Sequence, residues 1–374
     1  MYALRADPLH QHPIHLTMHT YPKVLITDET LRDGLQIERE GVTLEEKLKL
    51  LDAMVDAGLK RMVVGAFVNP KWSPQMADTL ELVKRLKPQA GVDFFALALN
   101  ERGREERQKY TPPLSVEPLP ATHLHMCDVF IRRNTNKSLE DQERFWRLPV
   151  ERAAQKGVQE SAIGLSAGFG SNWSGKFSHE ARMDELQRQV DAWASIGATV
   201  RRIDVADPMA WNTPVEVAKD IEGIKKRWPT IQQFHLHLHN ARGLAMLSVY
   251  EALKLLEPSD TLIADTALGG IGGCPYCGNG QATGMISTED LCHLLDNLGI
   301  PTGINLNKLI EASALLSSIL GRPLHSQVAF NGGLPSKEQL YDLDMPVVYT
   351  FKEAQHFRLG PSVYEGNARP WIKA

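Results

Sequence analysis

The chain has 374 residues, 43% of them apolar, enough to bury the core of two ordinary domains or of one α/β barrel with extensions. Its formal net charge is −4 and its pI is near 6.4, with Lys and Arg scattered along the chain. These values argue against a protein that binds nucleic acid or anionic lipid, so we expect a small-molecule partner and neither nucleic acid nor a membrane.

The sequence lacks the features of a secreted or membrane protein. It contains no window of about 18 apolar residues, and its N-terminal segment does not have the basic and then apolar order of a signal peptide. Its four cysteines are too sparse for a disulfide scaffold in a chain of this length. We therefore expect reduced thiols and a cytoplasmic location.

Eight short apolar runs rich in β-forming residues alternate with amphipathic stretches from residue 24 to about residue 300. Such alternation is typical of a parallel sheet with helical crossovers. The runs span residues 24–28, 61–67, 93–99, 122–127, 159–167, 199–206, 233–239 and 261–268.

The stretches between these runs have the periodicity of helices. In residues 43–58, Thr43 can cap the first turn, Leu51 and Met54 share one face, and Gly58 can end the helix. One weaker helix is expected after Asn100. The other predicted helices span residues 73–86, 138–156, 179–195, 214–227, 242–256 and 287–297.

Eight strand–helix units predict a TIM (β/α)8 barrel over residues 23–299, with its active site at the C-terminal ends of the strands. We expect residues 1–22 to form a tail. Residues 300–374 are expected to be a C-terminal extension that carries one more helix, at 305–321, and packs on the barrel.

Charged residues stand where two predicted strands end. Arg32 and Asp33 follow the first strand, and alone such a dipeptide is more typical of a surface ion pair than of an active site. His235, His237 and His239 alternate along the seventh strand, so they share the face that points into the barrel. With Asp33 across the mouth, His237 and His239 form a two-histidine, one-carboxylate set suited to a divalent metal. For His235, one layer deeper, a structural role is favoured.

A glycine-rich loop follows the eighth strand and precedes a helix that begins near Ser287. We expect this loop to fold over the mouth of the barrel as a lid. Cys274 and Cys277 within it match the CxxC pattern of a redox pair, but a lone CxxC outside a thioredoxin-like unit is weak evidence. A thiol that serves as acid or base in the lid is favoured over disulfide exchange.

Taken together, five motifs resemble the 3-hydroxy-3-methylglutaryl-CoA lyase family, metal-dependent TIM-barrel lyases related to isopropylmalate synthase and 4-hydroxy-2-oxovalerate aldolase. The resemblance runs from about Lys23 to Leu316. The motifs are TLRDGLQ (30–36), FVNPKWSPQMAD (67–78), HLHNARG (237–243), GGIGGCPY (269–276) and STEDLCHLLDNLGIPTGINLNKLIEA (287–312).

The resemblance implies roles for particular residues. It implies that Arg32 stabilises the enolate oxygen that develops as a carbon–carbon bond breaks, and that Cys274 transfers a proton. It implies a divalent cation, Mg²⁺ or Mn²⁺, bound by Asp33, His237 and His239. Asp204 and Glu289 match acidic positions near the family's active site. Four residues match substrate-contacting positions of the family, namely Gln36, Arg132, Asn134 and Asn136. For the basic segment that contains the last three, a solvated surface is an equal alternative.

This sequence also departs from the family pattern. Val63 stands where the lyases carry an acidic residue on strand two, and Met285 stands where they carry an asparagine metal ligand. Asn279, in a loop two residues longer than the family's, is the expected substitute for that ligand, with water as the alternative. His235 and Cys277 are additions to the pattern.

We therefore expect a metal-dependent carbon–carbon lyase that acts on a 3-hydroxy acid or its CoA thioester, with a substrate other than hydroxymethylglutaryl-CoA. A condensing synthase is the first alternative, although the extension after residue 300 is short for a regulatory domain. A metal-dependent TIM-barrel hydrolase is the second. The family resemblance further suggests a homodimer.

Overall fold

The computed structural model describes residues 20–98, 101–116, 119–277, 284–340, 347 and 349–351, apart from the side chains of Glu101 and Gln339. Residues up to Asn331 form one compact unit, and those from Gly332 onward form another, which contains a short 3-10 helix, Lys337–Gln339. Most of the predicted tail over 1–22 lies outside the described residues. All elements discussed below belong to the first unit.

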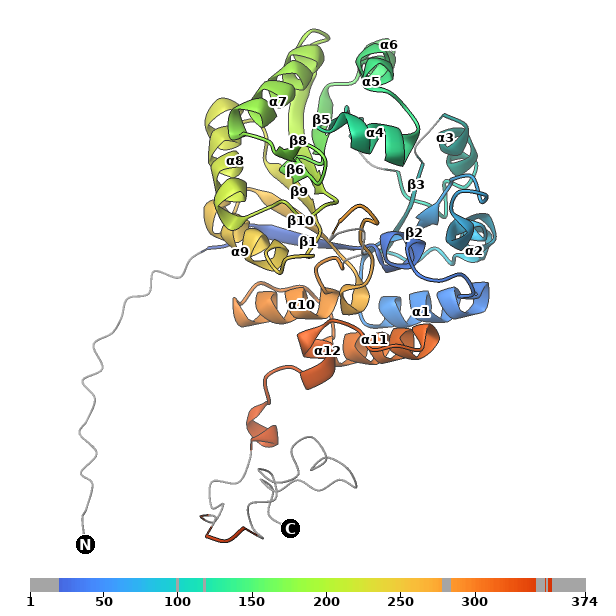
Figure 1. Ribbon diagram of the computed structural model, residues 1–374, viewed down its shortest axis with the longest axis vertical. Coiled ribbons are helices and arrows are strands. Elements are labelled where there is room, and N and C mark those ends of the chain that lie inside the picture. The colour runs from blue at the N-terminus through green and yellow to red at the C-terminus, as the bar shows by residue number, and fades with distance from the viewer. Residues whose placement is uncertain are drawn as a thin grey trace, which may run out of the picture. The chain divides into compact units, whose positions relative to one another are not determined.

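Eight parallel strands form one curled sheet in the order β3-β2-β1-β10-β9-β8-β5-β4 (Figure 1). The first and last strands of the barrel, β1 and β10, pair in register from Lys23 opposite Thr261 to Asp28 opposite Thr266. Among the described residues no ladder joins β3 to β4. Every strand overlaps one of the eight predicted runs, which confirms the TIM-barrel prediction. The bounds are β1 Lys23–Asp28, β2 Arg61–Ala66, β3 Asp93–Leu97, β4 Leu124–His125, β5 Glu160–Ser166, β8 Thr199–Asp207, β9 Gln233–Leu238 and β10 Thr261–Thr266.

Helices surround the sheet on its outer face (Figure 1). None of those in the described residues is long and apolar enough to cross a membrane. Their bounds are α1 Leu44–Asp56, α2 Thr79–Arg85, α3 Glu101–Gln108, α4 Asp128–Thr135, α5 Leu139–Phe145, α6 Leu148–Gln155, α7 His179–Ala194, α8 Pro214–Arg227, α9 Ala245–Leu255, α10 Thr288–Asn297, α11 Leu306–Leu320 and α12 Gln327–Asn331.

Two helix predictions were wrong in detail. The single helix expected over 138–156 is two helices, α5 and α6, because Pro149 in the first turn of α6 has no N–H to continue a helix from α5. The helix expected over 73–86 is a 3-10 turn, Pro74–Met76, followed by α2. The helix α4 and a small antiparallel hairpin, β6 (Gly170–Ser171) and β7 (Gly175–Lys176), were not predicted.

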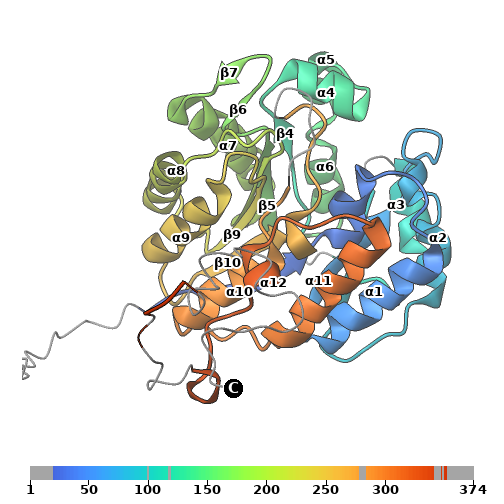
Figure 2. The same ribbon diagram turned by 60° about the horizontal axis from the view of Figure 1, so that its bottom comes forward.

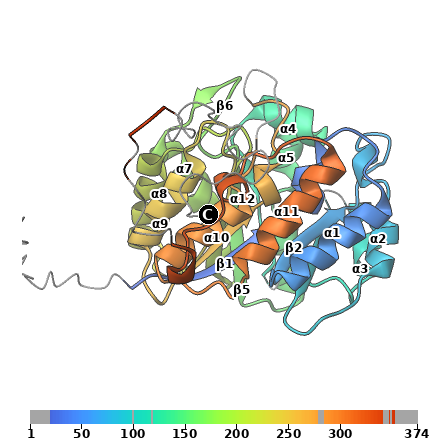
Figure 3. The same ribbon diagram turned by 90° about the horizontal axis from the view of Figure 1, so that it is seen from below.

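The helices α1 and α11 lie side by side on the outside of the barrel (Figures 2 and 3). A capping box between Thr43 and Glu46 starts α1, as predicted from Thr43. The backbone N–H of Asn305 donates to the carbonyl oxygen of Ala57 at 2.8 Å, which ties the start of α11 to the end of α1. Apolar residues of both helices belong to the main hydrophobic core, so α11 is part of the barrel unit.

The interior of the barrel is polar and partly hollow. In most TIM barrels branched apolar side chains fill this space. Here a cavity of about 280 Å³ lies within it, walled on one side by Val63, Phe95 and Leu97. The polar side chains that line the same cavity include Arg32, Arg61, His123, Arg202, Asp204 and His235. Burial of polar side chains costs free energy, so the polar interior of this barrel indicates a functional site.

Candidate metal centre and active site

A tight turn after β1 places Arg32 and Asp33 at the mouth of the barrel. Residues Thr30–Gly34 form a single π-helical turn directly after the strand. The carboxylate of Asp28 accepts a hydrogen bond from the backbone N–H of Thr30 at 2.8 Å, and the hydroxyl of Thr30 accepts one from the N–H of Leu268 at 2.8 Å. The turn is thereby fixed to the end of β10, and Asp33 is buried.

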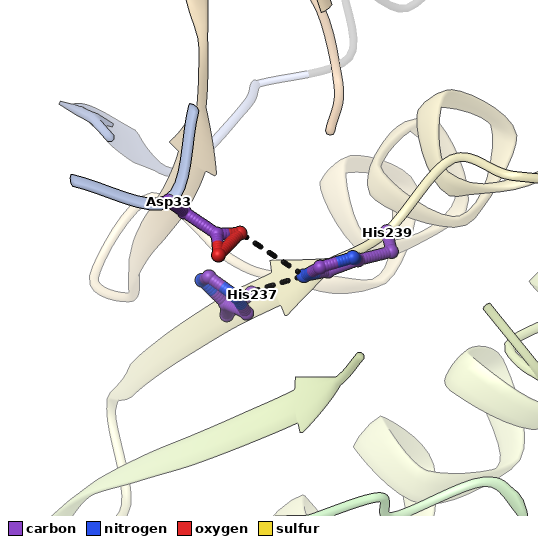
Figure 4. A group of neighbouring side chains, drawn as sticks. All are labelled: Asp33, His237 and His239. Atoms are coloured by element: carbon purple, nitrogen blue, oxygen red, sulfur yellow. Dashed lines mark hydrogen bonds and ion pairs between the residues drawn. The ribbon is translucent and has the colours of Figure 1, made fainter. Parts of the chain in front are cut away.

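Asp33, His237 and His239 converge, as the sequence predicted (Figure 4). Nε2 of His239 lies 3.4 Å from Oδ2 of Asp33 and 3.2 Å from Nε2 of His237. The ligand atoms of the three residues all lie within 4.8 Å of one another. These separations suit a shared ion better than three independent side chains.

The donor set fits a divalent cation. Oδ2 of Asp33 is buried and has no hydrogen-bond partner among the described residues, which is costly for a carboxylate oxygen unless another group meets it. Burial lowers the pKa of His239 to about 4, so its imidazole is neutral and can act as a ligand. Burial opposes ionisation of Asp33, but Arg32 and His239 outweigh it and hold the pKa of Asp33 below its usual value. Two imidazole nitrogens and one carboxylate are ligands of divalent transition metals, and Asp33 supplies the hard oxygen that Mg²⁺ and Mn²⁺ prefer.

Arg32 is held by two carboxylates. Its Nε donates to Oε2 of Glu29 at 2.7 Å, and one terminal nitrogen donates to Oδ1 of Asp33 at 3.2 Å. Burial raises the pKa of Glu29, although the charge of Arg32 opposes this effect. Arg32 also lines the cavity, so a planar guanidinium faces the space beside the Asp33 carboxylate.

A chain of alternating charges runs below the metal ligands. Nδ1 of His237 lies 2.9 Å from Oδ2 of Asp265, and Oδ1 of Asp265 lies 2.7 Å from Nε2 of His235. Nδ1 of His235 lies 3.0 Å from Oδ1 of Asp204, which also pairs with Arg202 at 2.9 Å. Burial works against a charged His235, but the two carboxylates outweigh it and raise the pKa of His235 to about 10.

The described part of the loop after β10, which is the predicted lid, contacts segments that follow other strands. The amide of Asn172 donates to the carbonyl oxygen of Tyr276 at 2.7 Å, and the Tyr276 hydroxyl donates to the carbonyl oxygen of Arg133 at 3.3 Å. The ring of Tyr276 lies 5.1 Å from that of Trp173. The lid is therefore fastened to the β6–β7 hairpin and to α4.

Both thiols of the lid are buried. Cys274 and Cys277 belong to one small apolar cluster with Cys127 and Met209. Burial raises the pKa of the Cys274 thiol to about 12, so this thiol keeps its proton at neutral pH. The thiol of Cys277 donates to the carbonyl oxygen of Met209 at 3.1 Å. Cys274 thus keeps its thiol proton in this conformation, and Cys277 ties the loop to Met209.

Two other acidic residues occupy different surroundings. Asp204 lies inside β8, three residues before the end of the strand at Asp207, and faces the cavity. Glu289 is fully buried at the start of α10, where its oxygens accept hydrogen bonds from the N–H of Gly269 at 2.9 and 3.0 Å and from the Ser287 hydroxyl at 2.7 Å. Burial raises the pKa of Glu289 to about 7. Its contacts hold the glycine turn from which the lid starts.

The predicted substrate-contacting residues lie on two segments. Gln36 is half-buried just after the turn that carries Asp33. The other three belong to α4, where Arg132 pairs with Asp128 at 3.1 Å and Asn136 ends the helix in a left-handed conformation with φ 54°. Asn134 is exposed on the same helix.

The two departures at the metal site have different outcomes. Asn279, expected as the fourth ligand, lies outside the described residues. Met285, at the family's asparagine position, is buried and forms a β-bridge with His239. Its thioether cannot supply the hard oxygen of an amide.

Reasoning from the sequence missed Glu29, Asp265 and Arg202. Asp265 had a signal, because a carboxylate inside the apolar run 261–268 needs a buried partner. Arg202 gave a similar signal in the run 199–206. The sequence contained no such signal for Glu29, because only the turn after β1 brings its carboxylate into contact with Arg32.

Comparison with known proteins gives a consistent result. A model of the HMGL-like family matches residues 23–316. Human mitochondrial hydroxymethylglutaryl-CoA lyase is 32% identical over 315 residues, which are 84% of this chain and 91% of that protein. The Pseudomonas aeruginosa protein named 3-hydroxy-3-isohexenylglutaryl-CoA/hydroxy-methylglutaryl-CoA lyase is 30% identical over 318 residues, covering 83% of this chain and 98% of that protein. A solved structure of an HMG-CoA lyase from Acinetobacter baumannii, in complex with coenzyme A and 3-methylmalate, matches with a TM-score of 0.69 and 26% identity, covering 87% of this chain and 98% of that one.

Proposed function

The chain belongs to the HMGL-like family, and we propose that it is a divalent-metal-dependent lyase that cleaves a carbon–carbon bond in a 3-hydroxy acid or its CoA thioester. The observation that carries this proposal is the convergence of Asp33, His237 and His239 beside Arg32. A bound Mg²⁺ or Mn²⁺ would polarise the oxygen atoms of the substrate. The set of donors supports this chemistry, which a hydrolase would share, but the adjacent guanidinium favours the lyase.

Residues of the chain would supply the remaining parts of the reaction. Cleavage of a 3-hydroxyacyl unit leaves negative charge on the oxygen of an enolate, and Arg32 is the fixed cation that lowers the free energy of that charge. Glu29 keeps the guanidinium in place. Cys274, a protonated thiol in the lid, is suited to protonate the enolate carbon. The lid excludes water, which would otherwise weaken these interactions.

The cavity supports a substrate different from hydroxymethylglutaryl-CoA. Val63 lines it at the position where the family's lyases carry an acidic residue, and an apolar side chain cannot orient a hydroxyl proton. Phe95 and Leu97 extend the same apolar wall, so a larger substituent on C3 can occupy the space. The name of the Pseudomonas relative includes a substrate with an isohexenyl group at that carbon, and the Acinetobacter structure contains coenzyme A. We propose an acyl-CoA or free hydroxy acid with a bulkier or differently substituted C3.

Steady-state kinetics with Mg²⁺ or Mn²⁺ test the proposal. Purified protein is assayed against hydroxymethylglutaryl-CoA, C3-substituted hydroxyacyl-CoA thioesters and free hydroxy acids, with mass detection of products. We expect a kcat/KM below about 10⁴ M⁻¹s⁻¹ for hydroxymethylglutaryl-CoA, the lower end of the usual enzyme range, and a higher value for a C3-substituted compound. Cleavage of hydroxymethylglutaryl-CoA above that value would refute the altered substrate while retaining the lyase.

The variant His237→Ala tests the metal centre in the same assay. It removes one of three ligands, so metal content and turnover should fall together. Full metal content and full activity in this variant would overturn the assignment. The variant His293→Ala provides a matched control, because it removes a half-buried imidazole of α10 that is not one of the three ligands, and it should alter neither quantity.

The homodimer remains a prediction from family resemblance, and the cytoplasmic location remains a prediction from the sequence features described above. Light scattering at micromolar protein concentration gives the molar mass directly. A value near twice the 41.7 kDa of one chain is expected.

A further inference from the structure

His235 is held between two carboxylates from the neighbouring strands. It lies two residues before His237 on the same face of β9, with Asp204 of β8 directly opposite in the ladder. Asp204 meets Nδ1 at 3.0 Å and Asp265 of β10 meets Nε2 at 2.7 Å. Both ring nitrogens therefore lie within hydrogen-bond distance of a carboxylate oxygen, so the ring bridges the two aspartates.

Asp265 links His235 to the metal ligand His237. Its Oδ1 accepts from His235 and its Oδ2 accepts from Nδ1 of His237 at 2.9 Å. With both oxygens engaged, the carboxylate cannot rotate away from either ring. The hydrogen bond on Nδ1 fixes the tautomer and the plane of His237, and it leaves Nε2 to point at His239.

Carboxylates alternate with nitrogen-bearing side chains along this row. Asp204 lies between Arg202 and His235, and Asp265 lies between His235 and His237. Without the His235 ring, two buried carboxylates would face each other across the space of one side chain, and Asp265 would lose the bond that orients it. Separation of the two carboxylates or entry of water would then follow, and either would move His237.

We propose that His235 is a positioning residue for the metal centre, which acts through Asp265 to set the orientation and metal affinity of His237. This inference rests on the proposed metal site. Asp265 is the direct hydrogen-bond partner of a ligand, and His235 is its support from one strand layer below. His235, which is an addition to the family pattern, would thus support the metal centre without contacting the metal or the substrate.

Mn²⁺ binding to the full chain tests this proposal, with the free ion measured by electron paramagnetic resonance. Loss of a hydrogen-bond partner behind a metal ligand typically weakens metal binding by about 10- to 100-fold. We expect His235→Leu to raise the Kd for Mn²⁺ by about 10-fold and Asp265→Asn by about 10- to 100-fold. His235→Gln, whose amide can donate to Asp265, should recover part of the loss. The visible absorption of the Co²⁺-loaded protein should change in His235→Leu, because the ligand field reports the direction of Nε2.

The matched control is His123→Leu. His123 lines the same cavity and its Nε2 lies 2.8 Å from the Ser166 hydroxyl, so it belongs to a different hydrogen-bonded group. Its replacement removes a polar ring from the cavity and should leave the Kd for Mn²⁺ and the Co²⁺ spectrum unchanged. A loss in His123→Leu equal to that in His235→Leu would show a general effect of cavity polarity and would overturn the proposal.

The remaining outcomes separate this inference from the proposed function. If the unaltered protein binds no Mn²⁺, the metal centre itself is refuted, and His235 has no site to position. If the unaltered protein binds Mn²⁺ and His235→Leu binds it within about twofold, only the role of His235 is refuted. Should His235→Leu fail to fold by circular dichroism, His235→Asn decides by the same measure, since its shorter side chain keeps a polar group between the two aspartates.

Discussion

Arg32 and Asp33 are neighbours in the chain, yet their side chains serve different partners. Asp33 directs Oδ2 toward the two histidines, while its Oδ1 accepts from Arg32 at 3.2 Å. Arg32 is fixed a second time by Glu29 at 2.7 Å. Because a guanidinium is planar, these two bonds determine the direction in which its remaining N–H groups point. A lysine at this position would keep the positive charge but would lose the planar group that directs the hydrogen bonds.

Arg32→Lys should therefore depress kcat by about 10² or more, with little change in KM, since the lost interaction develops with the enolate. Initial rates over a range of substrate concentrations separate the two constants. Arg85→Lys is the control, because Arg85 is an exposed arginine that pairs with Glu45 at 3.0 Å. An increased KM at unchanged kcat would instead identify Arg32 as an anchor for the substrate.

At the scale of elements, the lid depends on three segments that are distant in sequence. The loop starts from a glycine turn, Leu268–Gly270, in which Gly269 has φ 60° and its N–H is held by Glu289. Its far part rests on the β6–β7 hairpin and on α4 through Tyr276. Cys274 lies between these two attachments. The conformation of the lid thus determines the position of the Cys274 thiol.

Tyr276→Ala should lower kcat by up to about 10²-fold, because loss of the attachment lets Cys274 move from its reactive position. The Kd for Mn²⁺ should change much less than kcat, since Asp33, His237 and His239 do not belong to the lid. Tyr276→Phe keeps the ring beside Trp173 and loses only the hydroxyl bond, so its effect should be smaller. An unchanged kcat in Tyr276→Ala would show that the attachment has no role in turnover.

For the barrel unit as a whole, the helix after the predicted barrel boundary is part of the core. Leu309, Leu316 and Leu320 of α11 are buried in the same hydrophobic core as residues of α1. The ammonium of Lys308 pairs with Asp56 at 2.8 Å at the edge of this contact. Stability of the barrel therefore depends on residues beyond 299.

Leu309→Ala should reduce the free energy of unfolding by about 2 to 5 kcal/mol, the cost of deleting a fully buried leucine side chain. Urea unfolding followed by circular dichroism measures the change. The exposed Glu311→Ala on the same helix should stay within about 0.5 kcal/mol. If both variants unfold alike, α11 does not contribute to the core as described.

Local patterns in the sequence were enough to predict the barrel and to select the three candidate metal ligands. Strand runs of five to nine residues with turn residues between them are local patterns, and each of the eight predicted runs overlaps a strand. Side chains alternate along a strand, so the spacing of His237 and His239 placed both on the inner face without knowledge of any other strand. Their meeting with Asp33 followed from the rule that barrel active sites lie at the C-terminal strand ends.

The surroundings of these residues depend on tertiary packing and could not be predicted from local patterns. The register of β8, β9 and β10 brings Asp204 and Asp265 to His235, and the turn after β1 brings Glu29 to Arg32. The break between α5 and α6, the attachments of the lid and the hollow interior were likewise absent from local patterns. Periodicity specifies the face of an element on which a side chain lies. The partner of a buried charge depends on strand register and side-chain rotamers, which are set by the packing of the whole barrel.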